Sequence, residues 1–341
     1  MMYSIVHLVD DATVGGVTRT LDFIASSHEL ARKSVHKVVP IRRGALTAPR
    51  FHADMIVSHL SVSWANLPLF ASVRAAYPKT PMVHIEHSYS ERFVATHVSD
   101  KRRFETLMRS VTALFDHVVA VSVTQGRWMK RKGYCPGGRL SVIESCVDLK
   151  PFLATEPRTG VTPRIVGALG RAENQKGLDI LVKAFKDDRL KAMELHIYGE
   201  GGQMEALKTL ADERANIVFK GFAKDPVAAI AACDVIAMPS RWEPYGIVAV
   251  EAMASSRPII CARVDGTDAH INGGAIDVGH NTPEAWADML SQLPSLDLEM
   301  AVLRGHVHAH RARRRFIMAW NALIDRVVHQ PHEPEAQRLA A

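Results

Sequence analysis

The 341-residue sequence lacks the features of a secreted or membrane-spanning chain. It has no run of 18 apolar residues, and its start, MMYSIVHLVDDATVGG, is too short and too acidic for a secretory signal. We therefore expect a cytoplasmic protein, with peripheral attachment to the inner face of a membrane as an open alternative.

Cysteine is also scarce. The four residues Cys135, Cys146, Cys233 and Cys261 show no CxxC spacing, so neither a zinc site nor a disulfide framework is predicted. The histidines of HVHAH at 306–310 alternate by two, which fits neither helical ligand spacing nor a finger pattern. We expect no bound metal and no other cofactor.

Two common nucleotide-binding motifs are missing. There is no GxxxxGK[ST], and no GxGxxG opens a βαβ unit at the front of the chain, which weakens P-loop and ordinary dinucleotide interpretations. Aromatic residues make up only 6% of the chain, so stacking on nucleic-acid bases has few candidates. We do not expect a nucleic-acid partner.

Basic charge, in contrast, is present and uneven. Residues 1–160 hold 21 Lys and Arg against 13 Asp and Glu, whereas residues 161–341 hold 21 against 23. The excess concentrates at 42–43, 101–103 and 127–132. A solvated face would explain it, and so would an anionic partner such as a membrane surface or a phosphorylated acceptor.

Short β-branched segments alternate with helical ones along the whole chain, which predicts an α/β fold of parallel sheets covered on both faces. Twelve strands are expected, at 4–9, 36–41, 53–60, 81–86, 117–122, 139–144, 164–170, 194–199, 216–221, 234–240, 257–262 and 274–279. Helices are expected at Val17–Arg32, Asp100–Leu114, Gly177–Lys186, Gln203–Asp212 and Pro283–Leu293. The turn-rich segment DLKPFLATEPRTGVTP splits the strands into two doubly wound, Rossmann-like domains at 1–155 and 160–309. An amphipathic helix at about 310–329 is expected to pack back toward the first.

The segment PSRWEPYGIVAVEAMASSRPII, residues 239–260, is mostly apolar yet holds two carboxylates, Glu243 and Glu251. Pro244 suits the first turn of a helix that would be buried on nearly every side. Glu243 would then lie at the helix start and Glu251 about two turns inside. An unpartnered buried carboxylate is costly, so either structural salt bridges or a hydroxyl-rich ligand is required.

Ligands of open α/β sheets bind beyond the carboxyl ends of the strands, and several such ends here carry glycine and positive charge. Gly15 and Gly16 open a helix after the first strand, and Gly199 follows the strand ELHIY. Arg171 follows the strand RIVGAL directly, and Lys176 leads into the next helix. Two cations at a strand–helix junction suit a diphosphate.

Four segments together resemble glycosyltransferase family 4, whose members are retaining enzymes of the GT-B fold. They are GRAENQKGLDIL, LHIYGEGG, NIVFKGF and PSRWEPYGIVAVEAMASSRPII. The resemblance extends in order from GGVTRTL near the start to the C-terminal helix, and its most specific element is the E-x7-E pair of Glu243 and Glu251.

The resemblance implies roles for these residues. Glu251 matches the acid that holds the ribose hydroxyls, and Glu243 matches the one against the donor sugar. Arg171 and Lys176 match the pair that neutralises the diphosphate, while Gly16 matches a loop closing over it. The backbone of Tyr245, Gly246, Ile247 and Val248 is implied to meet sugar and phosphate. Cations near the leaving group and a carboxylate near the sugar would stabilise the charge separation without a metal.

His87 matches a family histidine that lies just past a first-domain strand and faces the donor; a capping or core role is the alternative. Glu86 is unusual at its position, and its role stays open. Ser145-Cys146 stands where the family usually shows Asn-Gly.

We therefore expect a retaining, metal-independent glycosyltransferase. Its donor would be a nucleotide sugar, with UDP favoured over GDP, and its acceptor a hydroxyl of a lipid or cell-envelope glycan. The alternatives are an epimerase or phosphorylase on the same fold, or a non-catalytic protein that binds anionic polymers through the basic half. Nucleotide-sugar turnover separates the last from the others.

Overall fold

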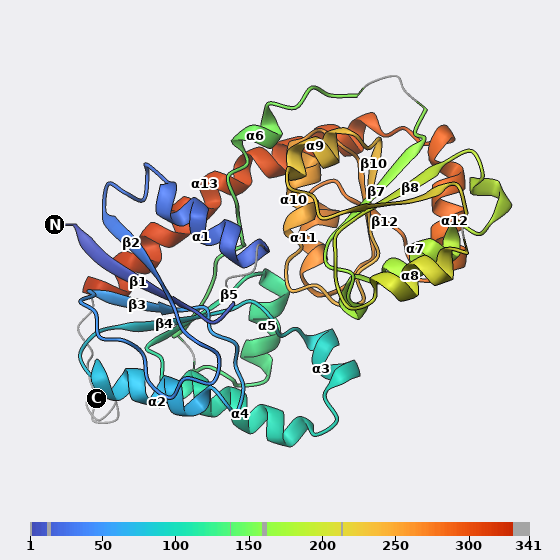
Figure 1. The fold of residues 1–341 in the computed structure, drawn as a ribbon. Coiled ribbons are helices and arrows are strands. Elements are labelled where there is room, and N and C mark those ends of the chain that lie inside the picture. Colours follow the sequence, from blue (N-terminus) through green and yellow to red (C-terminus); the bar gives the residue numbers. More distant parts are fainter. Residues whose placement is uncertain (1, 12–14, 137, 159–161, 213, 330–341) are drawn as a thin grey trace. The chain divides into compact units, whose positions relative to one another are not determined.

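The computed structural model describes residues 2–11, 15–136, 138–158, 162–212 and 214–329, and the chain forms two compact units (Figure 1). Unit 1 comprises residues 1–89, 97–147 and 314–341, and unit 2 comprises residues 90–96 and 148–313. Each unit is built on its own six-stranded parallel sheet.

The unit 1 sheet has the strand order β2-β1-β3-β4-β5-β6. Its strands are β1 (Tyr3–Val9), β2 (Ser34–Pro40), β3 (Met55–Ser58), β4 (Met82–Glu86), β5 (His117–Ala120) and β6 (Leu140–Val142). The four central strands are the most apolar, and β3, β4 and β5 are buried along their whole length. This burial is expected of a parallel sheet with helices on both faces.

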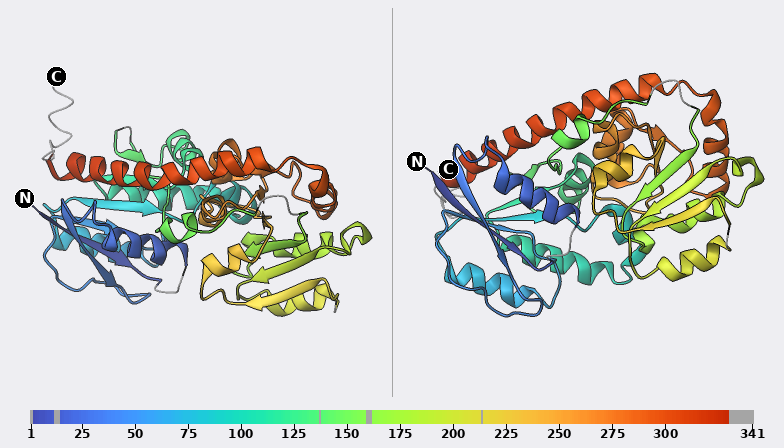
Figure 2. Two further views of the ribbon diagram at one scale, coloured as in Figure 1. Left: turned by 90° about the horizontal axis from the view of Figure 1, so that it is seen from above. Right: turned by 45° about the horizontal axis from the view of Figure 1, so that its top comes forward.

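Helices cover both faces of the unit 1 sheet. They are α1 (Gly16–Ser26), α2 (Leu67–Ala76), α4 (Lys101–Ala113), α5 (Val123–Arg131) and the second part of α13 (Glu299–His329). On one face α1 lies beside α13, where the rings of Phe23 and Phe316 are 5.6 Å apart (Figures 1 and 2). On the other face α2 and α4 pack, and Phe70 of α2 meets Phe115.

The unit 2 sheet has the order β12-β11-β10-β7-β8-β9. Its strands are β7 (Ile165–Leu169), β8 (Glu194–Tyr198), β9 (Ile217–Gly221), β10 (Val235–Met238), β11 (Ile259–Cys261) and β12 (Ile276–Asp277). The helices of unit 2 are α3 (Glu91–His97, apart from its last residue), α6 (Lys150–Leu153), α7 (Leu178–Ala184), α8 (Met204–Ala211), α9 (Pro226–Ala231), α10 (Ile247–Ala254), α11 (Asp268–Asn272), α12 (Pro283–Gln292) and the first part of α13. Single 3-10 turns are η1 (Asn174–Lys176), η2 (Asp188–Leu190), η3 (Asp265–Thr267) and η4 (Leu293–Ser295).

All twelve expected strands are present, and the two doubly wound sheets predicted from the alternating pattern are confirmed. The helix expected at Val17–Arg32 is shorter, because α1 ends at Ser26 and turns follow. Conversely, α13 begins at Glu299, well before the expected 310, and it contains the HVHAH segment. The described helices include none that is long and apolar enough to cross a membrane.

The division between the units differs in detail from the expected 1–155 and 160–309. Unit 2 begins at Asp148 because the short helix α6 packs against α10, and it also takes residues 90–96. The boundary at the other end lies inside α13, between Arg313 and Arg314. In the unit 1 part of α13, Phe316, Trp320 and Leu323 are buried on one face, as their spacing predicts.

Candidate functional site

In unit 2, glycines bring the turns after β7 and β8 unusually close together. Gly199 has φ +147°, and a Cβ on it would lie 1.9 Å from the carbonyl oxygen of Gly170. A Cβ on Gly201 would lie 2.6 Å from the oxygen of Ala172. Only glycine tolerates such an approach, so these residues shape the turn that carries Arg171. The Arg171 side chain is exposed and makes no hydrogen bond or ion pair with a described residue.

Lys176 lies at the end of η1, immediately before α7. The next residue, Gly177, has φ +63°, and a Cβ there would lie 2.2 Å from the oxygen of Pro239. This close packing holds the start of α7 against the segment that leaves β10. The sequence signal, a Lys-Gly pair before a helix, therefore has a steric cause as well as an electrostatic one.

The structure brings Lys176 and Glu243 together. Lys176 Nζ donates to Glu243 Oε2 at 2.5 Å, and Ser240 Oγ donates to the same oxygen at 3.2 Å. The exposed fractions of the two charged side chains are 21% and 8%. Because the pair is largely shielded from water, its charges interact more strongly than an exposed pair would.

Asp265 supports the backbone of Glu243 and was not predicted from the sequence. Its carboxylate accepts the N–H of Glu243 at 3.2 Å, the hydroxyl of Ser90 at 2.7 Å and the N–H of Arg92 at 3.0 Å. Burial raises the pKa of Asp265, and these hydrogen bonds act in the opposite direction. Its φ of +43° is uncommon for a residue with a side chain, and no local sequence pattern announces it.

The helix α10 begins at Ile247, and its N-cap residue Gly246 has φ +91° with no side-chain cap. The backbone N–H groups of Ile247 and Val248 belong to the first turn and have no intrahelical partner. Such a helix start favours an anion. The Tyr245 side chain is buried against His270, with ring centroids 4.6 Å apart, so only its backbone faces this end of the sheet.

Glu251 lies in the middle of α10 and is only 1% exposed. A ligand can reach its carboxylate only if neighbouring side chains move aside. The structure thus separates the two acids: Glu243 is paired with a cation at the strand ends, and Glu251 is enclosed within the unit.

In unit 1, His87 follows β4 directly, and Glu86 anchors the loop that carries it. Glu86 Oε1 accepts the N–H groups of Ser88 and Tyr89 at 2.7 and 2.9 Å, and Oε2 lies 3.5 Å from His84 Nε2. Burial alone would raise the pKa of Glu86, but these hydrogen bonds lower it below its usual value. Glu86 therefore shapes the loop through its backbone.

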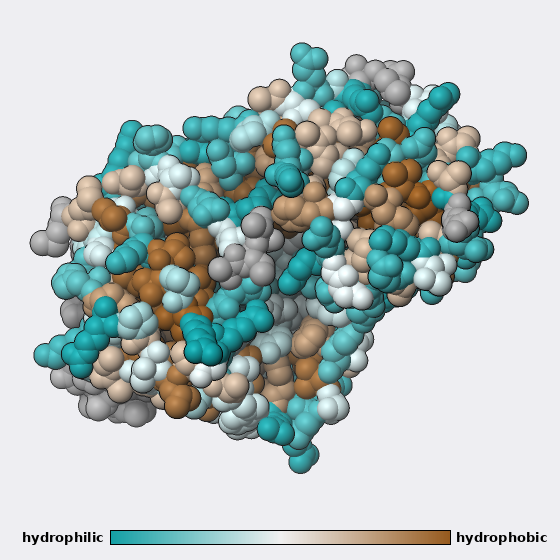
Figure 3. All heavy atoms as spheres, viewed as in Figure 1, coloured by the Kyte–Doolittle hydropathy of each residue, from teal (hydrophilic) through white to brown (hydrophobic). Residues whose placement is uncertain are grey.

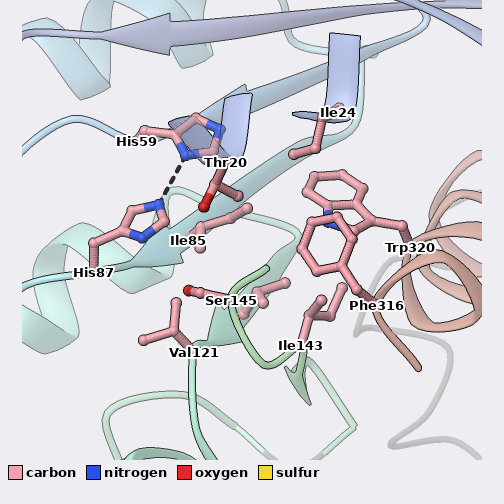
Figure 4. A pocket seen from close by; sticks show the side chains of 11 residues that line it. Thr20, Ile24, His59, Ile85, His87, Val121, Ile143, Ser145, Phe316 and Trp320 are labelled. Atoms are coloured by element: carbon pink, nitrogen blue, oxygen red, sulfur yellow. Dashed lines mark hydrogen bonds between the residues drawn. The ribbon is translucent and has the colours of Figure 1, made fainter. Parts of the chain in front are cut away.

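His87 lines a small pocket of unit 1 (Figure 4). Its Nε2 lies 2.8 Å from His59 Nδ1, and the two rings stack with centroids 5.1 Å apart. The pocket walls are otherwise mostly apolar, with Thr20 of α1 and Ser145 adding hydroxyls. Burial lowers the pKa of His87 to about 4, so its imidazole is neutral at pH 7.

The remaining expected elements of unit 1 are found as follows. Gly15 is the N-cap of α1, and its N–H donates to Thr18 Oγ1 at 2.9 Å; residues 12–14 lie outside the described part of the chain. The residues at 101–103 and 127–132 lie on α4 and α5, and most of their basic side chains are exposed (Figure 3). Lys132 is paired with Glu105 at 3.0 Å.

Within the described residues, no three His, Cys, Asp or Glu side chains converge as metal ligands would.

Two family models match the chain. The model described as Glycosyltransferase Family 4 matches residues 14–151, and the model described as Glycosyl transferases group 1 matches residues 163–295. They fall on the two sheets in turn.

Curated relatives share the same name. The chain is 28% identical over 223 residues to a D-inositol 3-phosphate glycosyltransferase from Corynebacterium urealyticum, covering 58% of this chain and 53% of that protein. It is 29% identical over 281 residues to one from Nocardia farcinica, covering 74% and 61%. The chain thus spans about half to three fifths of the length of these relatives.

Solved structures resemble the chain along nearly its whole length. Anabaena HepE, crystallised with UDP and glucose, has a TM-score of 0.73 at 19% identity, covering 96% of this chain and 99% of that one. Sucrose-phosphate synthase from Thermosynechococcus elongatus also gives 0.73, at 17% identity, covering 95% and 98%. These likenesses show the fold: two facing Rossmann-like sheets of the GT-B type.

Proposed function

Because the chain belongs to glycosyltransferase family 4, we propose that it moves a sugar from a nucleotide-sugar donor to a hydroxyl acceptor with retention of configuration. The observation that carries the proposal is the cation pair at the strand ends of unit 2. Arg171 is exposed there, and Lys176 is held against Glu243 at 2.5 Å.

The arrangement suits a departing nucleoside diphosphate. As the glycosidic bond breaks, negative charge develops on the phosphate oxygens and positive charge on the sugar ring. Lys176 and Arg171 would stabilise the first charge, together with the N–H groups of Ile247 and Val248 at the start of α10. Glu243 would stabilise the second, while Ser240 and Asp265 hold it in place. With two cations supplied by the chain, the reaction needs no metal.

Binding of the donor would rearrange the Lys176–Glu243 pair. In the free structure Lys176 Nζ donates to Glu243, so an incoming diphosphate competes with that carboxylate for the same ammonium group. The ammonium has three protons and can serve both acceptors at once. The ion pair thus holds Lys176 in position before the donor arrives.

We propose UDP as the nucleotide and a lipid or cell-envelope glycan as the acceptor. The nearby structures of HepE and of Staphylococcus aureus TarM were both solved with UDP, which supports the uridine donor. The curated relatives are named for D-inositol 3-phosphate, so that polyol phosphate belongs among the acceptors to be tested. Glu251 would hold the ribose hydroxyls once its surroundings open, and His87 would face the sugar.

A panel of UDP- and GDP-sugars, followed by thermal shift and by slow donor hydrolysis, tests the proposal. A ligand at 100 times its Kd stabilises the folded state by about 2.7 kcal/mol, so the true donor should stand out. Retention is then checked by NMR of the product anomer. The absence of both a shift and hydrolysis with every donor would contradict the proposal, and release of an epimerised sugar would favour the epimerase alternative.

The exposed basic face of α4 and α5 supports peripheral binding to an anionic membrane. Arg103 lies over the ring of Trp64 at 5.8 Å, and Trp64 is 40% exposed, a pairing suited to a lipid headgroup region. Each such Lys or Arg contributes about 1 kcal/mol near an anionic surface. Sedimentation with anionic but not neutral vesicles, lost when Arg102, Arg103, Lys130 and Arg131 are replaced by Glu, would support this. Equal binding to neutral vesicles would return the charges to a solvated face.

A further inference from the structure

Four imidazole rings from neighbouring strands of the unit 1 sheet are hydrogen-bonded in series. His36 Nδ1 lies 2.9 Å from His7 Nε2, His7 Nδ1 lies 2.9 Å from His59 Nε2, and His59 Nδ1 lies 2.8 Å from His87 Nε2. We call these four residues the histidine relay. At its far end, His36 Nε2 lies 2.9 Å from Ser34 Oγ.

The topology of the sheet explains the series. The rings come from β2, β1 and the residues that directly follow β3 and β4, which are adjacent in the order β2-β1-β3-β4. Trp320 of α13 packs against two of them, with centroids 5.9 Å from His7 and 6.3 Å from His36. The relay is thus covered by α13 on its helix-bearing face, and it ends at His87 in the pocket of Figure 4.

All four rings are neutral at pH 7. Burial lowers the pKa of His7 and of His59 well below the usual value, and it lowers that of His36 and of His87 to about 4. A neutral imidazole carries one N–H and one acceptor nitrogen. Every ring of the relay must therefore point its single proton the same way as its neighbours, because two facing N–H groups or two facing lone pairs make no hydrogen bond.

This requirement leaves two arrangements for the whole series, and Ser34 distinguishes them. Ser34 Oγ lies 3.2 Å from the carbonyl oxygen of Leu30, which can only accept. The single hydroxyl proton is taken by that carbonyl, so His36 Nε2 must donate to Ser34 Oγ. Each following ring is then protonated at Nε2 as well.

We propose that Ser34 and the histidine relay set the tautomer of His87, with Nε2 protonated toward His59 and Nδ1 left as an unprotonated acceptor for a substrate hydroxyl. Ser34, His36, His7 and His59 are positioning residues, since they act on the substrate only through His87. This extends the general rule that the hydrogen bond at one ring nitrogen decides the protonation of the other.

The acceptor character of His87 Nδ1 has a consequence for specificity. Within the described residues this nitrogen has no hydrogen-bond partner, so it is available to a ligand. It would bind a group that donates, such as a hydroxyl of the sugar or acceptor, and would disfavour a deoxy or O-methyl analogue at that position. That the ligand is a sugar hydroxyl rests on the proposed function, whereas the direction of the relay does not.

The ionisable groups around the relay are few. Glu86 and His84 of β4 act on His87, in opposite directions on its pKa. Lys33, which precedes β2, is paired with Asp325 of α13 at 2.8 Å. From α1 and α13 the pocket receives Thr20, Ile24, Phe316 and Trp320, which are uncharged. The relay is therefore controlled by hydrogen bonds rather than by a nearby ion pair.

NMR of the protein labelled with ¹⁵N-histidine, without any substrate, tests the direction of the relay. The two ring nitrogens of each tautomer have distinct chemical shifts, and at pH 7.5 we expect His87 to be protonated at Nε2. In Ser34→Ala the Nδ1–H form of His87 should increase, and Ser34→Thr, which keeps the hydroxyl, should restore the wild-type spectrum. Ser141→Ala is the matched control, because Ser141 Oγ is bonded to His117 Nε2 at 2.8 Å in the same sheet but outside the relay.

Transfer kinetics then test the link to the substrate. Ser34→Ala should lower kcat about threefold to tenfold, the range expected from one neutral hydrogen bond, with KM for the donor and the melting temperature matching those of Ser141→Ala. A wild-type His87 protonated at Nδ1, or a Ser34→Ala spectrum identical to the wild type, would overturn the relay. A shifted tautomer with unchanged kcat would overturn the substrate role alone. If no nucleotide sugar is turned over, the proposed function fails while the NMR result still decides the relay.

Discussion

The two units solve the same structural problem with opposite chemistry. Each brings polar side chains to the carboxyl ends of central parallel strands, where an α/β sheet binds its ligands. Unit 1 does so with neutral imidazoles in a series that ends at His87. Unit 2 uses full charges, with Lys176 against Glu243 at 2.5 Å and Arg171 exposed nearby.

The difference shows what each end is prepared for. A buried charge requires a partner of opposite sign, so the unit 2 residues are ready for a ligand that carries its own charge, such as a diphosphate. A neutral relay requires only hydrogen-bond direction, which suits an uncharged ligand such as a hydroxyl. The two halves can therefore be perturbed separately, by removing a charge in one and by changing protonation in the other.

The largest expected effect is loss of a unit 2 cation. Lys176→Ala should lower turnover by on the order of a hundredfold, as removal of one pre-organised donor to developing charge does elsewhere. Lys183→Ala is the control, since Lys183 lies on the same helix, is 50% exposed and pairs only loosely with Asp179 at 3.7 Å. Steady-state kinetics with the donor found in the panel measure both. Normal turnover in Lys176→Ala would remove this residue from the leaving-group role.

Acid should weaken unit 1 before unit 2. The folded pKa values of His36, His87 and His117 are about 4, mainly through burial, against 6.5 in the unfolded chain. Unfolding therefore takes up protons as the pH falls from 6.5 toward 4, and stability is lost across that window. At pH 5.5 each such ring shifts the equilibrium about tenfold toward the unfolded state.

Hydrogen exchange at pH 5.5 and 7.5, corrected for intrinsic rates, measures this difference. Amides of β1, β3 and β4 should lose protection, and those of β7, β8 and β10 should lose less. In unit 2 the pKa of Asp179 is lowered, mainly by its hydrogen bonds from Arg241, so that group loses stability only below about pH 4. Equal loss of protection in both sheets would contradict the contrast between neutral and charged ends.

Much of this comparison could be predicted from the sequence, because it depends on local patterns. Alternating apolar runs predicted all twelve strands, and the E-x7-E spacing together with Lys176-Gly177 predicted which side chains matter in unit 2. The Lys176–Glu243 contact itself was not predicted, since it depends on Gly177 packing against Pro239 across the sheet.

The histidine relay and Asp265 were missed for a related reason. His7, His36 and His59 lie far apart in the chain and meet only because β2, β1, β3 and β4 are neighbours. A histidine near each of four strands was visible in the sequence, but their alignment required the strand order. Asp265 acts through the backbone of Glu243, and backbone contacts leave no residue-type signal.

A smaller effect is expected at the enclosed acid of unit 2. Glu251→Gln should weaken binding of the nucleoside diphosphate about tenfold, because a charged acceptor for ribose hydroxyls becomes a mixed donor and acceptor. The substitution keeps the size of the side chain at a site that is only 1% exposed, so the fold should persist. Isothermal titration with UDP measures the change, and deoxyuridine diphosphate is the matched ligand. An unchanged Kd would exclude Glu251 from the ribose site.

The smallest expected effect is that of metal removal. If Lys176 and Arg171 neutralise the leaving group, a chelator should leave turnover within about twofold of its starting value, because the protein supplies the charge that a divalent ion supplies elsewhere. The measurement is the transfer rate in EDTA, in EDTA with excess Mg²⁺, and in buffer alone, each after gel filtration to remove carried-over ions. Lys176→Ala sharpens the comparison: added Mg²⁺ should rescue little of its loss, since the chain places no carboxylate cluster there to hold the ion among its described residues. Full loss in EDTA that returns with Mg²⁺ would show that unit 2 depends on a metal after all, and that its charged end differs less from a metal-dependent site than the ion pair suggests.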